Sequence, residues 1–124
     1  MPKIASVPTI DEFRPVVLRV LNDGQARPVK EIARLAAEYL KIPEEVTSQM
    51  LPSGNQSRVT NLVNWACSSF LFAGLVIRVK RGWYQITDDG RIVDSRNLSS
   101  YNKSEMMEWP QWKNTIKKSL FALL

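Results

Sequence analysis

Residues 51–74 read LPSGNQSRVTNLVNWACSSFLFAG, and this stretch decides the fold. Ser53-Gly54-Asn55 is typical of a loop, and either Ser53 or Asn55 can cap the first free N–H groups of a following helix. Gly74 suits the left-handed residue that ends a helix. We therefore predict one long helix between these two signals.

The apolar residues of this stretch recur at three- and four-residue steps, which predicts one buried helix face. They are Val59, Leu62/Val63, Ala66, Phe70 and Ala73. Trp65 borders the stripe, and we expect it to pack with Ala66 rather than to recognise a ligand. Cys67 has no cationic neighbour in the sequence that would activate its thiol, so we expect it to be inert.

The opposite helix face is small and polar, and it is basic at its N-terminal end. It carries Ser57, Arg58, Asn61, Asn64 and Ser68, and Asn55 and Gln56 come just before it. Such side chains can form hydrogen bonds with base edges and phosphates. We therefore predict that these residues contact nucleic acid; the alternative is a solvated helix face.

Two short strands are predicted directly after this helix. Leu75–Val79 and Trp83–Thr87 are β-branched or aromatic, and Lys80-Arg81-Gly82 between them is a turn. Arg78 alternates to the same strand face as Lys80. We predict phosphate contacts from Arg78, Lys80 and Arg81, the alternative being a tight turn with soluble charges.

Three further helices are expected upstream. Thr9-Ile10-Asp11-Glu12 fits a capping box, and Pro15 lies inside the helix that follows it, which predicts a kink or a late start. The apolar face of this helix is Phe13, Val16, Val17, Val20 and Leu21. Pro28 suits the first turn of a second helix, whose apolar face is Val29, Ile32, Leu35, Ala36, Tyr39 and Leu40. Pro43 opens a short third helix.

The predicted fold is therefore mainly α with a small β-hairpin, in the order of a winged helix-turn-helix with a C-terminal helical extension. We expect a winged-helix domain over residues 1–94, a polar linker or short helices over 95–109, and an amphipathic helix over 110–124. Trp112, Ile116, Leu120 and Leu123 form the apolar side of that last helix.

Charge divides the 124-residue chain into two unlike halves. Residues 1–50 hold seven basic and seven acidic side chains, whereas residues 51–124 hold ten basic and five acidic ones. The net charge of +5 therefore lies in the half that contains the long helix and the hairpin. That distribution suits a polyanionic partner.

Several functional classes are disfavoured by composition. One cysteine and no histidine argue against a disulfide, a zinc site or imidazole chemistry, and we expect no metal and no cofactor. No apolar run approaches the length of a membrane span, so we expect a cytoplasmic protein without a membrane partner. Gln111-Trp112-Lys113 lies in a helical pattern and does not fit a metal-dependent nuclease centre, so we predict no catalysis in this chain.

Several separated motifs then resemble one family in order. LPSGNQSRVTNLVNWACSSFLFAGLVIRVKRGWYQITDDGRIV, with the upstream VPTIDEFRPVVLRVL, is similar to the N-terminal domain of Mrr-type restriction endonucleases over roughly residues 7–94. The resemblance implies a winged-helix DNA-binding domain, normally followed by a nuclease domain that cuts modified DNA. The family's arginine after the motif asparagine is Leu62 here. A DNA contact from that arginine is thus absent or made by Arg58.

The resemblance points to double-stranded DNA as the partner and to sensing of modified DNA in a restriction system as the role. A stand-alone winged-helix transcriptional regulator, or a protein-interaction module on the same fold, is the alternative. Further partners to test are a fused or separate nuclease domain and a second copy bound through the C-terminal helix.

Overall fold

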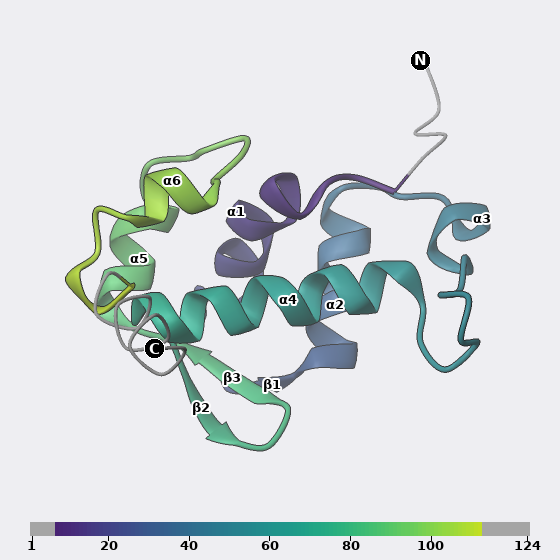
Figure 1. Cartoon of the computed structure of the whole chain (residues 1–124), viewed down its shortest axis with the longest axis horizontal. Helices are drawn as coiled ribbons and strands as arrows, with labels where there is room; N and C mark the ends of the chain where they lie inside the picture. Colours follow the sequence, from purple (N-terminus) through teal and green to yellow (C-terminus); the bar gives the residue numbers. More distant parts are fainter. Residues whose placement is uncertain (1–6, 113–124) are drawn as a thin grey trace, which may run out of the picture.

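The computed structural model describes residues 7–112, and the predicted helix over 110–124 therefore lies largely outside the described residues. The elements are α1 (Ile10–Val20), β1 (Arg27–Pro28), α2 (Val29–Tyr39), α3 (Glu44–Thr47), α4 (Arg58–Ala73), β2 (Val76–Lys80), β3 (Trp83–Ile86), α5 (Asp88–Asp94) and α6 (Lys103–Met106). The prediction of a mainly α fold with a small β-hairpin is confirmed. In Figure 1, α4 crosses the molecule between the helices above it and the hairpin below it.

The buried face of α4 is the one that its sequence predicts. Val59, Val63, Ala66, Phe70 and Ala73 are buried, and they pack against α1, α2 and β2. Gly74 ends the helix with φ +79°, as predicted. Each fully buried side chain of the size of Val63 or Phe70 contributes about 1.5–3 kcal/mol to stability.

The start of α4 differs from the prediction. Neither Ser53 nor Asn55 caps it; the Ser57 hydroxyl accepts the Thr60 N–H at 3.0 Å. Residues 51–56 form a loop that closes on its own backbone, because the Leu51 N–H donates to the Gln56 carbonyl at 2.9 Å. The helix can begin only after this closure, so Asn55 and Gln56 lie in the loop and not on the helix.

The sheet has a third strand that the sequence did not reveal. The order is β1-β3-β2, antiparallel throughout, with Arg27 opposite Tyr84 and Pro28 opposite Trp83. Two residues are too few for an alternating pattern, and proline, which lacks an N–H, is tolerated at a sheet edge. The Val29 N–H also donates to the Gly82 carbonyl at 3.0 Å. The hairpin turn is thus fixed to the first turn of α2.

Two aromatic side chains expected in the core are exposed. Tyr39 is 58% exposed, because the buried face of α2 centres on Ile32, Ala33 and Ala36 and leaves Tyr39 to one side. Trp65 is 60% exposed, so the prediction that it packs in the core is wrong. It lies at the edge of the buried face of α4, in a groove that Ile10 and Trp112 also line.

Helix α1 shows how the chain accommodates Pro15. The capping box of Thr9 and Glu12 is present, and the helix runs through Pro15 without a late start. Proline has no N–H to donate to the carbonyl of Asp11, four residues earlier. That carbonyl instead accepts the Tyr101 N–H at 2.9 Å. The bond lost inside α1 is thus replaced by one that holds a distant segment.

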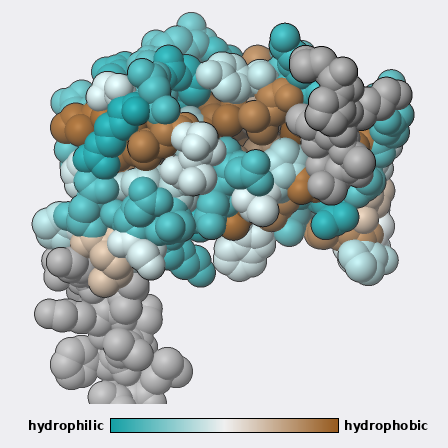
Figure 2. Space-filling view, turned by 90° about the horizontal axis from the view of Figure 1, so that it is seen from above, coloured by the Kyte–Doolittle hydropathy of each residue, from teal (hydrophilic) through white to brown (hydrophobic). Residues whose placement is uncertain are grey.

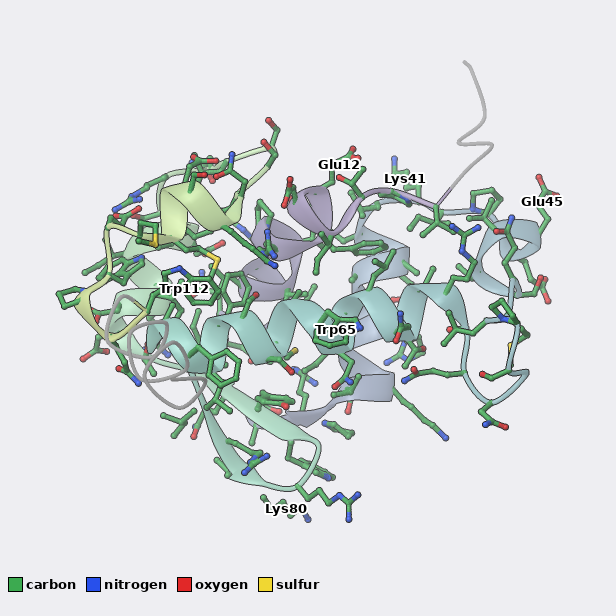
Figure 3. The ribbon with its side chains drawn as sticks, in the orientation of Figure 1. Glu12, Lys41, Glu45, Trp65, Lys80 and Trp112 are labelled. Carbon is green, nitrogen blue, oxygen red and sulfur yellow. The ribbon has the colours of Figure 1, made fainter. Side chains whose placement is uncertain are left out.

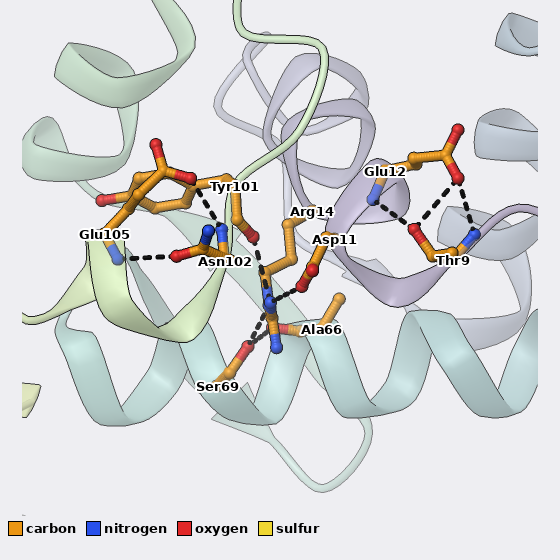
Figure 4. A network of polar contacts seen from close by, with 9 residues as sticks. All are labelled: Thr9, Asp11, Glu12, Arg14, Ala66, Ser69, Tyr101, Asn102 and Glu105. Atoms are coloured by element: carbon orange, nitrogen blue, oxygen red, sulfur yellow. Dashed lines mark hydrogen bonds and ion pairs between the residues drawn. The ribbon is translucent and has the colours of Figure 1, made fainter.

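The same corner contains a buried arginine (Figure 4). Arg14 is 1% exposed; its Nη1 donates to Asp11 Oδ1 at 2.6 Å and to the Tyr101 carbonyl at 3.0 Å, and its Nε donates to Ser69 Oγ at 3.2 Å. Burial lowers the pKa of the Arg14 guanidinium from its ordinary value, and the Asp11 carboxylate opposes that shift. This network connects α1, α4 and the chain after α5, and it was not predicted.

The chain after α5 packs on the domain. Tyr101 and Met106 are fully buried, and Arg96 forms a two-bond ion pair with Glu108. The Tyr101 hydroxyl donates to Glu108 and accepts from the Trp109 indole N–H, each at 2.9 Å. Burial raises the pKa of Tyr101 to about 12. The short helix α6 lies here, within the segment expected to be a polar linker or short helices.

The surface is polar with hydrophobic areas. Seen from above, hydrophobic residues form an interrupted band between hydrophilic ones (Figure 2). Within residues 7–112, no helix combines the length and the apolar character needed to cross a membrane. Over the same range, no group of three or more His, Cys, Asp or Glu residues is placed to hold a metal ion.

Replacing Arg14 tests the buried network. Arg14→Leu leaves the buried Tyr101 carbonyl without its side-chain donor and should lower the free energy of unfolding by about 2–4 kcal/mol. Arg34→Leu is the control, because Arg34 and Glu38 form an ion pair with side chains 59% and 62% exposed. It should cost less than about 1 kcal/mol. Denaturant unfolding measures the loss of stability in both variants. Equal losses of unfolding free energy would contradict a stabilising role for the buried Arg14 network.

Cys67 gives a second test of the core. The side chain is fully buried, and burial raises the pKa of its thiol to about 12. A thiol reagent should therefore label native protein only at the rate of unfolding. In Ser100→Cys the added thiol, at an exposed position in the chain after α5, should react at once with one equivalent. Rapid labelling of native Cys67 would contradict this packing.

Candidate nucleic-acid interface

An open groove of about 680 Å³ lies between α2, α4, the loop before α4 and the hairpin turn; we call it the polar groove. It is lined by Val29, Lys30, Met50, Asn55, Gln56, Ser57, Thr60, Asn64 and Gly82. Four of the residues predicted to contact nucleic acid, Asn55, Gln56, Ser57 and Asn64, are among them. The structure thus gathers residues from the loop and from the helix on one concave surface.

The walls of the polar groove are fixed in position by backbone hydrogen bonds. Gly82 has φ +78°, a conformation that glycine adopts without strain, and its carbonyl accepts the Val29 N–H. On the other side, the Arg58 N–H donates to the Gln49 carbonyl at 2.9 Å, and Met50 pairs with Ser57 in an isolated bridge. The hairpin turn and the loop before α4 therefore hold a constant relation to α4.

Three side-chain amides in this region form no hydrogen bond with the described residues. No hydrogen bond within residues 7–112 engages the side-chain amides of Gln56, Asn61 or Asn64. Each amide offers two donors and an acceptor, which is the combination that reads base edges. Ser57 is different, because its hydroxyl accepts the Thr60 N–H and donates to Thr60 Oγ1 at 2.8 Å.

Basic side chains lie on the elements that border the polar groove. Lys30 lines the polar groove, and none of the described residues that line it is acidic. Arg58 is exposed at the first turn of α4, where its Nη1 donates to Gln49 Oε1 at 3.1 Å. Arg78, Lys80 and Arg81 are exposed on the hairpin, and Lys80 lies at its tip in Figure 3. The positive charge of the C-terminal half is thus partly concentrated here.

The hairpin charges are not arranged as predicted. A register shift between Arg78 and Lys80 places Arg78 opposite Tyr84 and Lys80 opposite Trp83. Neighbouring residues of β3 point to opposite faces of the sheet, so Arg78 and Lys80 do not share a face. Lys80 lies over the Trp83 ring instead, with its Nζ 4.2 Å from the ring centre. The prediction of one basic strand face is therefore wrong.

The remaining predicted residues lie outside the polar groove. Asn61 is half-buried on the outward side of α4, and Ser68 lines a second, aromatic groove with Trp65 and Phe72. Leu62 is partly buried against the core, and Arg58 is the exposed guanidinium at the start of α4.

Lys30 and Thr60 line the groove but were not predicted. The signal for Lys30 was available, because a basic residue two positions after Pro28 falls in the first turn of a helix that packs beside α4.

Comparison with known proteins identifies the family. Residues 11–96 match the family described as the Mrr N-terminal domain, and the chain therefore belongs to this family. No curated protein and no solved structure gives a significant match. The chain thus contains a domain related to restriction systems. In Mrr, this N-terminal domain is separate from the nuclease domain.

Asn64 gives the test of the polar groove. If duplex DNA occupies it, Asn64→Ala should narrow the gap in binding free energy between preferred and non-preferred duplexes by about 1–3 kcal/mol. Ser68→Ala, one turn further along α4 and in the other groove, is the matched control and should leave the gap unchanged. Fluorescence anisotropy with both duplexes measures it. A larger effect from Ser68→Ala would exclude this placement.

Proposed function

We propose that this chain binds double-stranded DNA through a winged helix-turn-helix, with α4 as the recognition helix and the β2–β3 hairpin as the wing. The order α1, β1, α2, α3, α4, β2, β3 supports this assignment. The observation that carries it is the set of unpaired amides of Gln56, Asn61 and Asn64 beside a rigidly held basic hairpin. Unpaired amides satisfy base edges, and basic side chains neutralise phosphates.

The contacts divide by chemistry. Asn64 and Gln56, within or beside the groove, and Asn61 on the outward side of α4 would reach base edges. Lys30, Arg58, Arg78 and Arg81 would contact phosphates, and Lys80 would do so while resting on Trp83. Since Arg78 and Lys80 lie on opposite faces of the hairpin, they would contact different phosphates. Asn55 and Ser57 would contribute polar contacts from the loop.

The family gives this binding a context. A domain related to restriction systems, without a predicted catalytic centre, fits the target-recognition part of a modification-dependent nuclease. In this proposal, cleavage is performed by a fused or separate nuclease domain. The chain itself positions that activity on DNA that carries a modification, and it needs no cofactor to do so.

Two other functions make different predictions. A transcriptional regulator on this fold would select a defined operator sequence and ignore modification. A protein-interaction module would not bind duplex DNA. A competition assay with methylated and unmodified versions of the same duplex, and with unrelated sequences, separates these functions. Preference for the methylated version across sequences supports the restriction role.

Salt dependence tests the DNA-binding proposal itself. If about four to six phosphates are neutralised, a plot of log K against log salt should have a slope of about −4 to −5. A salt titration by anisotropy with a duplex of fixed sequence measures the slope. Affinity that is unchanged by salt, or absent at low salt, would refute the proposal.

Neutralising the hairpin tip should act on all duplexes alike. Lys80→Ala together with Arg81→Ala should reduce the salt slope by about two and weaken preferred and non-preferred duplexes by the same factor. Lys103→Ala is the control, because Lys103 begins α6, on the far side of α4 from the hairpin in Figure 1. A selective loss for one duplex would assign the hairpin a role in base readout instead.

A further inference from the structure

A second groove, of about 250 Å³, lies along α4 on the side of α1 and α6; we call it the aromatic groove. It is lined by Ile10, Arg14, Trp65, Ser68, Ser69, Phe72, Lys103 and Trp112. Trp65 and Phe72, which form its outer wall, are 60% and 46% exposed. Trp65, Ser68, Ser69 and Phe72 are spaced as one helical stripe about two turns long, with small residues between two aromatic ones.

This groove contains a buried polar group that lacks a partner. The indole N–H of Trp112 is buried and has no acceptor among the described residues. Arg14, which lines the same groove, is 1% exposed and uses Nε and Nη1 in its own network. Buried donors are normally satisfied, and a contiguous exposed apolar patch marks an interaction site. Both observations indicate that a chain segment with acceptor groups lies here.

The chain itself leaves from this groove. Trp112, the last described residue, forms part of the wall, and the side chain of Gln111 lies so close to Gly74 that a Cβ there would overlap it. Residues 111 and 112 are therefore at the C-terminal end of α4. Figure 3 shows Trp112 at that end and Trp65 in front of the middle of α4. A segment that continues from Trp112 to Trp65 must run antiparallel to α4.

The sequence that follows matches the groove. Ile116, Leu120 and Leu123 repeat at helical spacing and span seven residues, the same length as Trp65 to Phe72. In a helix, Lys117 and Lys118 lie away from this apolar stripe, which suits a groove whose own charged residues, Arg14 and Lys103, are basic. Carbonyl and hydroxyl groups of the segment offer acceptors. A helix of this length is marginal alone and needs a surface.

We propose that residues 113–124 dock in the aromatic groove of their own chain, antiparallel to α4, with Ile116 nearest Phe72 and Leu123 nearest Trp65. The tether at Trp112 favours the same chain over a second copy, because it gives the segment a high effective concentration at the groove. The docked segment covers Ser68 and leaves the polar groove open. The proposal is therefore independent of DNA binding and removes Ser68 from the contacts to DNA.

Cysteine pairs in the full chain test the docking. In the proposed register, Ser119 is close to Ser68, and Ser68→Cys with Ser119→Cys keeps every apolar and charged residue. Ser68→Cys with Lys118→Cys is the control, because position 118 lies on the outward side of the segment. Cys67 stays in place, since its buried thiol, with a pKa raised to about 12, does not exchange. Each variant is first checked for cooperative melting when reduced.

The readout is the rate of intrachain disulfide formation in a glutathione redox buffer, followed by mass spectrometry. The Ser68/Ser119 pair should close about tenfold faster than the Ser68/Lys118 pair, at a rate independent of protein concentration. Equal rates would overturn the proposal. So would covalent dimers whose rate rises with concentration, because they would assign the groove to a second copy.

Discussion

The structure depends on the burial of one face of α4. With 3.6 residues per turn, packing Val63, Ala66 and Phe70 against α1, α2 and β2 leaves no freedom in how the rest of the helix faces. Thr60 and Asn64 must line one groove, and Trp65 and Phe72 must line the other. The packing of one face of α4 thus creates both grooves. We propose DNA binding for the polar groove and docking of the C-terminal segment for the aromatic groove.

Two backbone hydrogen bonds attach the remaining parts to this helix. The bond from Val29 to Gly82 holds the hairpin turn against α2, and thereby at a constant distance from α4. The bond from Tyr101 to Asp11 uses the carbonyl that Pro15 leaves free and anchors the chain after α5 beside Arg14. Pro15 removes one hydrogen bond from α1, and the Asp11 carbonyl that it leaves free forms a tertiary contact with Tyr101. The domain therefore extends beyond its hairpin.

Features with local causes could be predicted from the sequence. The capping box at Thr9, the left-handed Gly74 and the apolar stripe of α4 all depend on residues within a few positions of one another. Features that depend on residues far apart in the sequence could not be predicted. The burial of Arg14 depends on Ser69 and Tyr101, and the short strand β1 exists only because β3 lies beside it. The exposure of Trp65 depends on how far the helices cover α4. Asn55, Gln56, Ser57 and Asn64 are close in sequence, which is why the sequence could suggest that they lie on one surface. Nothing in the sequence indicated the bulge that puts Arg78 and Lys80 on opposite faces of the hairpin.

The central claim is that duplex DNA occupies the polar groove, and NMR tests it most directly. Adding a short duplex to labelled protein should shift the side-chain amide signals of Gln56 and Asn64 and the backbone signal of Gly82. The backbone signals of Tyr39 and Lys103, outside this groove, should not move. Shifts confined to Trp65, Phe72 and Lys103 would place the duplex in the aromatic groove and contradict the account, as would the absence of any shift.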